Sequence, residues 1–193
     1  PAVALASLEG GATERIADTR RPVGSSLLGM ARQMRQALGL VAPVRDELVA
    51  RWRADPPALV VADFAAVPAG LAASALGVPW VTTLLPPFVL EVGDGPPAYL
   101  GGWRPVGGPL GRLRDAAGWA TVRTAKASLA LAFRRDLAAA GVARLRPDGS
   151  EAIYSPLAIV APWMRELEFG QRFPPHLHFI GPLFGNPERR PPL

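Results

Sequence analysis

The chain has 193 residues, of which 49% are hydrophobic and 19% charged, a composition that excludes a disordered chain and suits one α/β domain. Its net charge is +5, but the basic residues are spread out and no aromatic residues alternate with them, which argues against a nucleic-acid partner. The lack of Cys excludes disulfides and Cys metal sites and favours a cytoplasmic protein.

The first predicted elements are a short strand at 3–7 and a helix over 25–52. Apolar residues recur at helical spacing in the second segment, and Ser25 is a plausible N-cap for it. Pro43 should kink or split this helix, because proline lacks the N–H that the helix needs. The side chains expected in the core are those of Met30, Met34 and Trp52.

A strand–helix–strand unit is predicted in the middle of the chain. The apolar run at 58–62 has strand length and suits a strand that is buried on both faces, as in parallel sheets. An Ala-rich helix over 65–77 follows and ends at Gly77, and the next strand covers 78–84. Two parallel strands joined by a helix are the repeating unit of a parallel α/β sheet.

The uncharged stretch at 64–90, which includes part of this unit, is also long enough to cross a membrane. Several Pro and Gly residues interrupt it, and each break would leave backbone polar groups unpaired in lipid. The strand–helix–strand interpretation explains the same residues better, so we expect no membrane span.

A loop rich in Pro and Gly covers 86–109, and a loop of this length is usually functional or mobile. A long helical stretch over 110–142 follows, and further strands are predicted at 157–161 and 177–181. The sequence therefore predicts an α/β fold with a Rossmann-like parallel sheet and flanking helices.

Two stretches carry a family resemblance, PPALVVADFAAVPAGLAASALGVPWVTT and LAIVAPWMRELEFGQRFPPHLHFIGPLF. In this order they resemble the N-terminal domain of UDP-sugar-dependent glycosyltransferases of the GT-B fold, which glycosylate macrolides, plant phenolics and sterols. The resemblance implies a single acceptor-binding domain over 1–185 that lacks its first strand and helix, and the start of an interdomain linker at 186–193. The chain is then expected to be the truncated N-terminal half of a GT-B fold, from a bacterial enzyme that glycosylates natural products.

The same resemblance implies an inverting transfer of sugar from a UDP-sugar to a hydroxyl of a small lipophilic acceptor, without a cofactor or metal. In the family, a His removes the proton of that hydroxyl, and an Asp orients the His and stabilises its charge. Asp63 matches the Asp. The Gly-His loop of the family has no counterpart, because the chain contains only His176 and His178. We therefore expect this chain to be inactive without a missing donor-binding domain and the segment that supplies the His.

Physical reasoning also favours a site at Asp63, because the carboxyl ends of parallel strands face the crevice where open α/β sheets bind ligands. The alternative is that Asp63 caps the following helix. Aromatic rings and hydroxyl groups near this crevice are candidates for an acceptor pocket, although the loop aromatics could instead close the loop onto its own domain. The candidate acceptor-binding residues are Phe64, Thr82, Thr83, Phe88, Tyr99 and Trp103.

Two further sets of residues have simpler interpretations. His176 and His178 would share one side of a strand, but no other ligands lie nearby, so a metal site is not expected. The Arg residues of 110–142 form a solvated helix face or, as in family members that act at membranes, a patch for peripheral contact with anionic lipid. The second functional hypothesis is a non-catalytic subunit of a two-chain transferase, which binds the acceptor or a membrane.

Overall fold

The structure is a computed structural model that describes Leu5 and residues 27–85, 90–92, 94–101, 103–147, 150–168 and 172–183. The strand predicted at 3–7 lies outside the described residues except for Leu5, which belongs to no helix or strand. Ser25, Phe88 and the predicted linker at 186–193 also lie outside them.

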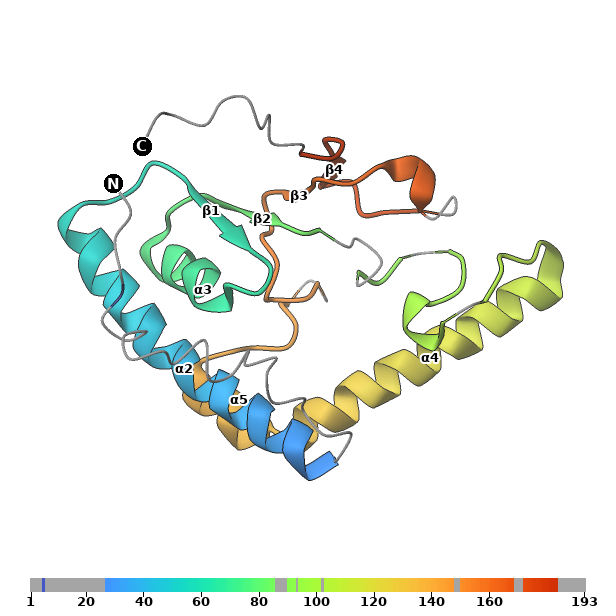
Figure 1. The fold of residues 1–193 in the computed structure, drawn as a ribbon, viewed down its shortest axis with the longest axis horizontal. Helices are drawn as coiled ribbons and strands as arrows, with labels where there is room; N and C mark the ends of the chain where they lie inside the picture. Colours follow the sequence, from blue (N-terminus) through green and yellow to red (C-terminus); the bar gives the residue numbers. More distant parts are fainter. Residues whose placement is uncertain are drawn as a thin grey trace, which may run out of the picture.

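Four parallel strands form one sheet in the order β1-β2-β3-β4 (Figure 1). Their bounds are Val60–Asp63 for β1, Trp80–Thr83 for β2, Ile159–Ala161 for β3 and Leu177–Phe179 for β4. Each strand overlaps a predicted one. The α/β, Rossmann-like architecture predicted from the sequence is therefore confirmed.

The helices are α2 (Leu27–Ala54), α3 (Val67–Leu76), α4 (Gly108–Ala132) and α5 (Arg134–Ala140), with short 3₁₀ turns η3 (Ala98–Leu100) and η4 (Arg165–Leu167). Gly77 ends α3 as predicted: its φ is 67°, a left-handed conformation that glycine adopts without strain. The stretch predicted as one helix over 110–142 is divided at Phe133 into α4 and α5.

The helix α2 differs from its prediction in two respects. Pro43 lies inside α2 and does not split it, because packing against α3 and α5 supports the helix along its length. Met30 and Met34 are 55% and 40% exposed, so the prediction that they lie in the core is wrong. Trp52, near the other end of α2, is partly buried against the sheet as predicted.

One face of the sheet is packed against helices. Val60, Ala62 and Trp80 form a buried cluster with Ala73 of α3, and α2 packs on the outer side of α3. Gly70 lets α3 approach closely, since a side chain there would collide with the indole of Trp80. This packing fixes α3, and with it the loop that follows β1, relative to the sheet.

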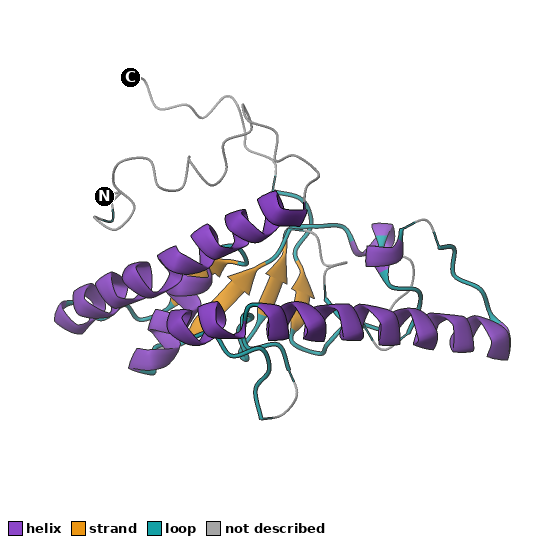
Figure 2. Ribbon diagram, turned by 90° about the horizontal axis from the view of Figure 1, so that it is seen from below, coloured by secondary structure: helices purple, strands orange, loops and turns teal. Residues whose placement is uncertain are grey.

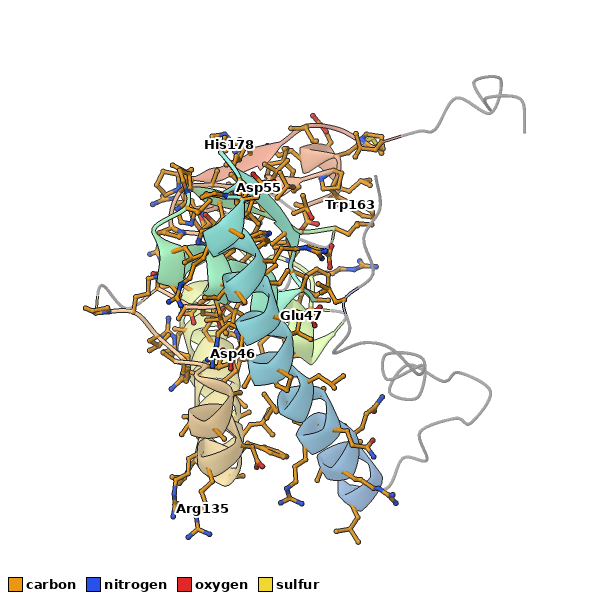
Figure 3. The ribbon with its side chains drawn as sticks, turned by 90° about the vertical axis from the view of Figure 1, so that its left-hand side faces the viewer. Asp46, Glu47, Asp55, Arg135, Trp163 and His178 are labelled. Atoms are coloured by element: carbon orange, nitrogen blue, oxygen red, sulfur yellow. The ribbon has the colours of Figure 1, made fainter. Side chains whose placement is uncertain are left out.

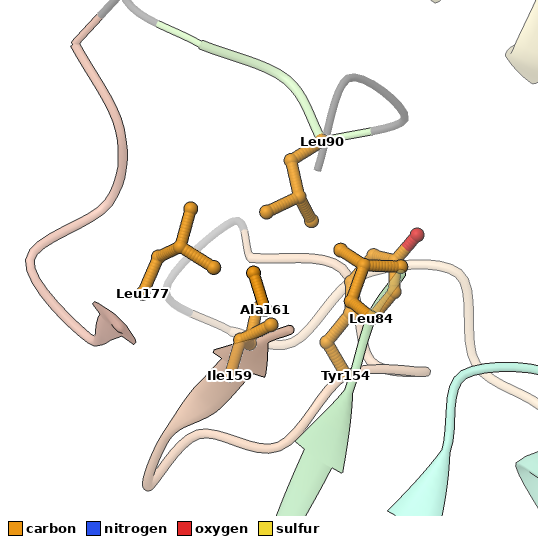
Figure 4. Packing of buried hydrophobic residues seen from close by; sticks show 6 residues of the cluster. All are labelled: Leu84, Leu90, Tyr154, Ile159, Ala161 and Leu177. Atoms are coloured by element: carbon orange, nitrogen blue, oxygen red, sulfur yellow. The ribbon is translucent and has the colours of Figure 1, made fainter. Parts of the chain in front are cut away.

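The same face carries a second cluster at β3 and β4 (Figure 4). Ile159 and Leu177 from these strands meet Leu84, Leu90 and Tyr154 from the neighbouring segments. Phe173 packs against this cluster and also against a third one, which contains Trp119 of α4, so α4 is attached to the sheet by way of this core.

The opposite face of the sheet is much more open. By strand alternation it carries Val61, Val81, Val160 and His178; Val61 is 63% exposed and His178 is also exposed. Connections between neighbouring parallel strands are almost always right-handed. Because the strand order β1-β2-β3-β4 follows the sequence, each connection passes over the same face of the sheet, and its helices lie on that face. Figure 1 shows α2, α3, α4 and α5 on the same side of the sheet, and Figure 2 views the molecule from that side. The described helices therefore cover only one of its two faces.

Candidate functional site

Asp63 is the last residue of β1, and its side chain is exposed. Its Oδ1 accepts a hydrogen bond from the N–H of Ala65 at 3.0 Å, and its backbone carbonyl accepts one from the N–H of Ala66 at 2.8 Å. The N-cap of α3 is Ala66, so Asp63 shapes the turn before the helix and is not its N-cap. Within the described part of the chain, the second carboxylate oxygen of Asp63 has no hydrogen-bond partner.

A cavity of about 690 Å³, here named the Asp63 cavity, has Asp63 among the residues that line it. Its walls come from the middle of α2, from the loop after β1 and from the first turn of α3, together with Leu5. Among the described residues that line it, Asp63 is the only charged one, and the others are aliphatic: they include Leu40, Val41 and Val44. A cavity of this size with apolar walls and one carboxylate suits a small lipophilic molecule that carries a polar group.

Thr83 is the candidate acceptor residue that the structure brings next to Asp63. The two residues are paired across β1 and β2, so their side chains lie on the same face of the sheet. The N–H of Phe64 donates to the carbonyl of Thr83 at 2.9 Å and holds the two strand ends together. Thr83 is half-buried and stands at the carboxyl edge where a ligand of the sheet would bind.

Thr82 and Phe64 contribute to packing instead. Thr82 is buried, and its Oγ1 accepts a hydrogen bond from the N–H of Ser155 at 2.8 Å, so the hydroxyl already has a structural partner. Phe64 packs against the hydrophobic cluster at β3 and β4. Their acceptor-binding roles stay predictions that this arrangement does not favour.

The loop aromatics give little support to a common pocket with Asp63. The guanidinium carbon of Arg114 lies 5.2 Å from the centroid of the Trp103 ring, and a methyl group on Gly118 of α4 would come within 2.9 Å of that ring. Trp103 thus closes its loop onto α4, which was the alternative interpretation. Tyr99 belongs to η3, but its side chain lies outside the described part, and the same holds for all of Phe88.

The walls that α2 contributes could not be identified as site residues from the sequence. In the sequence, Val41 is only one of the apolar residues that recur at helical spacing. That periodicity shows which face of α2 turns inward, but it does not distinguish a wall of a cavity from a residue in a filled core. No other signal in this segment would have indicated the cavity.

The two histidines lie away from Asp63. His178 is exposed on β4 (Figure 3), at the opposite edge of the sheet from β1. His176 directly precedes this strand. Among the described residues no group of three or more His, Asp or Glu side chains is arranged to hold a metal ion.

None of the described helices is both long enough and apolar enough to span a membrane.

Comparison with known proteins adds no assignment. No protein-family model matches the chain, and no curated protein matches its sequence.

Proposed function

We propose that the chain is part of the acceptor-binding domain of an inverting glycosyltransferase, which moves a sugar from a UDP-sugar to a hydroxyl of a small lipophilic acceptor. The Asp63 cavity carries this proposal, because it combines aliphatic walls with a single carboxylate at the carboxyl end of a parallel strand. The apolar walls would hold the body of the acceptor, and the acceptor hydroxyl would lie at the polar end near Asp63.

In the proposed reaction Asp63 acts through a histidine. That His takes the proton of the acceptor hydroxyl while the oxygen bonds to the anomeric carbon and UDP leaves from the opposite side. The carboxylate of Asp63 holds the imidazole in the correct tautomer and stabilises the imidazolium that forms. Because His176 and His178 lie at β4, we propose that a further segment of the enzyme supplies this His. The UDP-sugar would be bound by a separate domain of the enzyme.

The open face of the sheet supports the proposal that further elements complete this domain. Parallel sheets are normally covered on both faces, whereas here Val61 of the edge strand β1 is 63% exposed. Additional parallel strands on the free side of β1 would follow one another away from β1, in the direction opposite to β2, β3 and β4. Their right-handed connections would then place their helices over the open face. These strands would also bring residues of their own carboxyl ends next to Asp63.

Ligand binding by the chain is the first test. We expect the protein to bind lipophilic phenols in ligand-detected NMR, and Val41→Trp, which fills the Asp63 cavity, to remove that binding. The matched control is Leu131→Trp, on an exposed position of α4, which should leave binding unchanged. Circular dichroism checks that both variants fold. Equal binding by a folded Val41→Trp protein would show that the phenols do not occupy this cavity.

Turnover by the complete transferase tests the role of Asp63. Asp63→Asn keeps the size of the side chain but removes its charge, so turnover should fall by about 10²- to 10⁴-fold while donor binding stays near normal. The control is Asp55→Asn, since Asp55 is an exposed carboxylate just after α2 (Figure 3). Unchanged turnover in Asp63→Asn would remove the catalytic role.

The second candidate function is a non-catalytic subunit of a two-chain transferase, which binds the acceptor or a membrane. The observation that favours it is that the Asp63 cavity lies in this chain while both histidines lie elsewhere in the fold. Its membrane-binding form rests on Leu110 and Leu113 of α4, which are exposed beside Arg112. The turnover test separates the two candidates, because a subunit that only binds would not need the charge of Asp63.

A further inference from the structure

A second cavity, of about 390 Å³, lies between α4, the residues 144–146 and 150–155, and the amino ends of β3 and β4. It shares no lining residue with the Asp63 cavity. Ile159 and His176 place it at the start of β3 and β4, whereas Asp63 ends β1. The described residues that line this second cavity, here named the basic cavity, include four cationic side chains and two carboxylates.

Two of the cations are neutralised by the two carboxylates. Arg123 of α4 donates from Nε to Oε1 of Glu91 at 2.6 Å, and Lys126, one turn further along α4, lies with its Nζ 2.8 Å from Oε1 of Glu151. These pairs connect α4 to the two segments that face it. Among the described residues that line the basic cavity, they leave no carboxylate for its other two cations, Arg144 and Arg146.

Within the described residues, the side chain of Arg146 is hydrogen-bonded only to neutral oxygens. Its Nη1 donates to Oγ of Ser150 at 3.1 Å and to the carbonyl of Glu151 at 2.9 Å, and its Nη2 donates to the carbonyls of Ala152 and Tyr154. These bonds hold the guanidinium in place against residues 150–154. They do not cancel its charge, and the half-buried position screens that charge less than bulk water would.

Arg144 and His176 complete the basic cavity. Neither side chain has a hydrogen bond or ion pair within the described residues. A guanidinium offers a planar set of N–H donors that matches the oxygens of a phosphate, and even a neutral imidazole offers one N–H donor. The cavity therefore combines two uncompensated positive charges with donors that have no partner in the described part of the protein.

We propose that the basic cavity binds a small dianion that carries a phosphate group, with Arg144 and His176 as its direct donors and Arg146 as a fixed second charge. Two positive charges that have no counterion among the described residues match the charge of a phosphate monoester or of inorganic phosphate. The apolar side chains of Leu90 and Ile159, which also belong to the core at β3 and β4 (Figure 4), give an organic group a surface to pack against. The site is independent of the glycosyltransferase proposal, because it shares no residue with the Asp63 cavity.

Titration of the chain with inorganic phosphate, at ionic strength held constant with chloride, tests the site. In two-dimensional NMR we expect amide signals of residues 144–146 and 150–155, and of His176, to shift and saturate at millimolar phosphate. Arg144→Gln should weaken this binding about tenfold or more, because one charge-assisted donor is lost. Arg112→Gln removes the same charge from an exposed position on α4 outside the cavity and should bind like the wild type.

Arg146→Gln is not suitable as the main variant, because the segment that Arg146 holds together could lose its fold. His176→Gln is the second variant, and it should also weaken binding. Titration with glycerol 3-phosphate identifies which kind of phosphate the site binds. Tighter binding than that of inorganic phosphate indicates a phosphate monoester, whereas equal binding indicates free phosphate. Both results support the site. Absence of saturable binding, or equal weakening by Arg144→Gln and Arg112→Gln, would overturn the proposal, since the effect would then follow net charge alone.

Discussion

Replacing Gly70 by Ala tests how closely α3 packs on the sheet. An added methyl carbon at Gly70 would lie 2.6 Å from two carbons of the Trp80 indole, whereas ordinary contact begins at 3.4 Å. Trp80 is only 6% exposed, so its ring is enclosed by the core, and either the ring or α3 must shift to make room for the methyl group. Overpacking of this kind costs about 1–3 kcal/mol of stability.

Gly39 provides the matched control, because it also lies inside a helix, α2, but an added methyl group there would meet no described atom within 4 Å beyond the neighbouring backbone of α2. Alanine is favoured over glycine in a helix interior by about 0.5–1 kcal/mol. Both variants gain this contribution, so their difference isolates the packing cost. We expect Gly39→Ala to be more stable than the wild type, and Gly70→Ala to be about 1–3 kcal/mol less stable than Gly39→Ala.

Urea unfolding, followed by far-ultraviolet circular dichroism and by Trp fluorescence, measures this difference. The comparison requires that the free energy of unfolding depend on urea concentration with the same slope in the wild type, Gly39→Ala and Gly70→Ala. If Gly70→Ala proves as stable as Gly39→Ala, then α3 does not approach Trp80 as closely as the structure shows. The first turn of α3 is also a wall of the Asp63 cavity, so the shape of that cavity would then be wrong as well.

Two further predictions concern buried polar groups. Ser155 Oγ donates to the carbonyl of Trp80 and accepts from the N–H of Leu157, so Ser155→Ala should lower the free energy of unfolding by about 1–3 kcal/mol. Thr82→Val removes the hydroxyl that accepts from the N–H of Ser155, so it should also lower the free energy of unfolding. Urea midpoints measure both changes, and unaltered stability in Thr82→Val would make its hydroxyl a candidate ligand contact again. Burial raises the pKa of Glu168, so the folded state keeps this proton to higher pH than the unfolded state does. The contribution of Glu168 to stability therefore falls as the pH rises from the ordinary carboxyl pKa through the raised pKa. Because Gln stays neutral, Glu168→Gln should be as stable as the wild type at about pH 3.5 but more stable than the wild type at about pH 7. A wild type that is the more stable protein at the higher pH would contradict this sign.

Local sequence was sufficient for the strands and for α3. The run before Asp63 and the segment around Trp80 are apolar over one strand length, and Gly77 adopts the left-handed conformation that its position after α3 predicts. The parallel pairing of β1 and β2 follows from the helix between them. These features depend on neighbouring residues, which is why they can be predicted without tertiary contacts.

Packing between distant segments is the physical origin of the features that patterning missed. Pro43 is accommodated because α3 and α5 pack against α2, and Thr82 is a structural residue because Ser155 reaches it from a segment 73 residues away. The position of Asp63 at a strand end could be predicted, but the cavity beside it depends on how α2 lies across α3. Apolar patterning and turn chemistry are local properties, so they specify the parallel α/β elements and the carboxylate that ends β1. Whether an apolar side chain fills a core or lines a cavity, and whether a cation has a counterion, depends on distances between segments far apart in the chain, and these distances exist only in the folded protein.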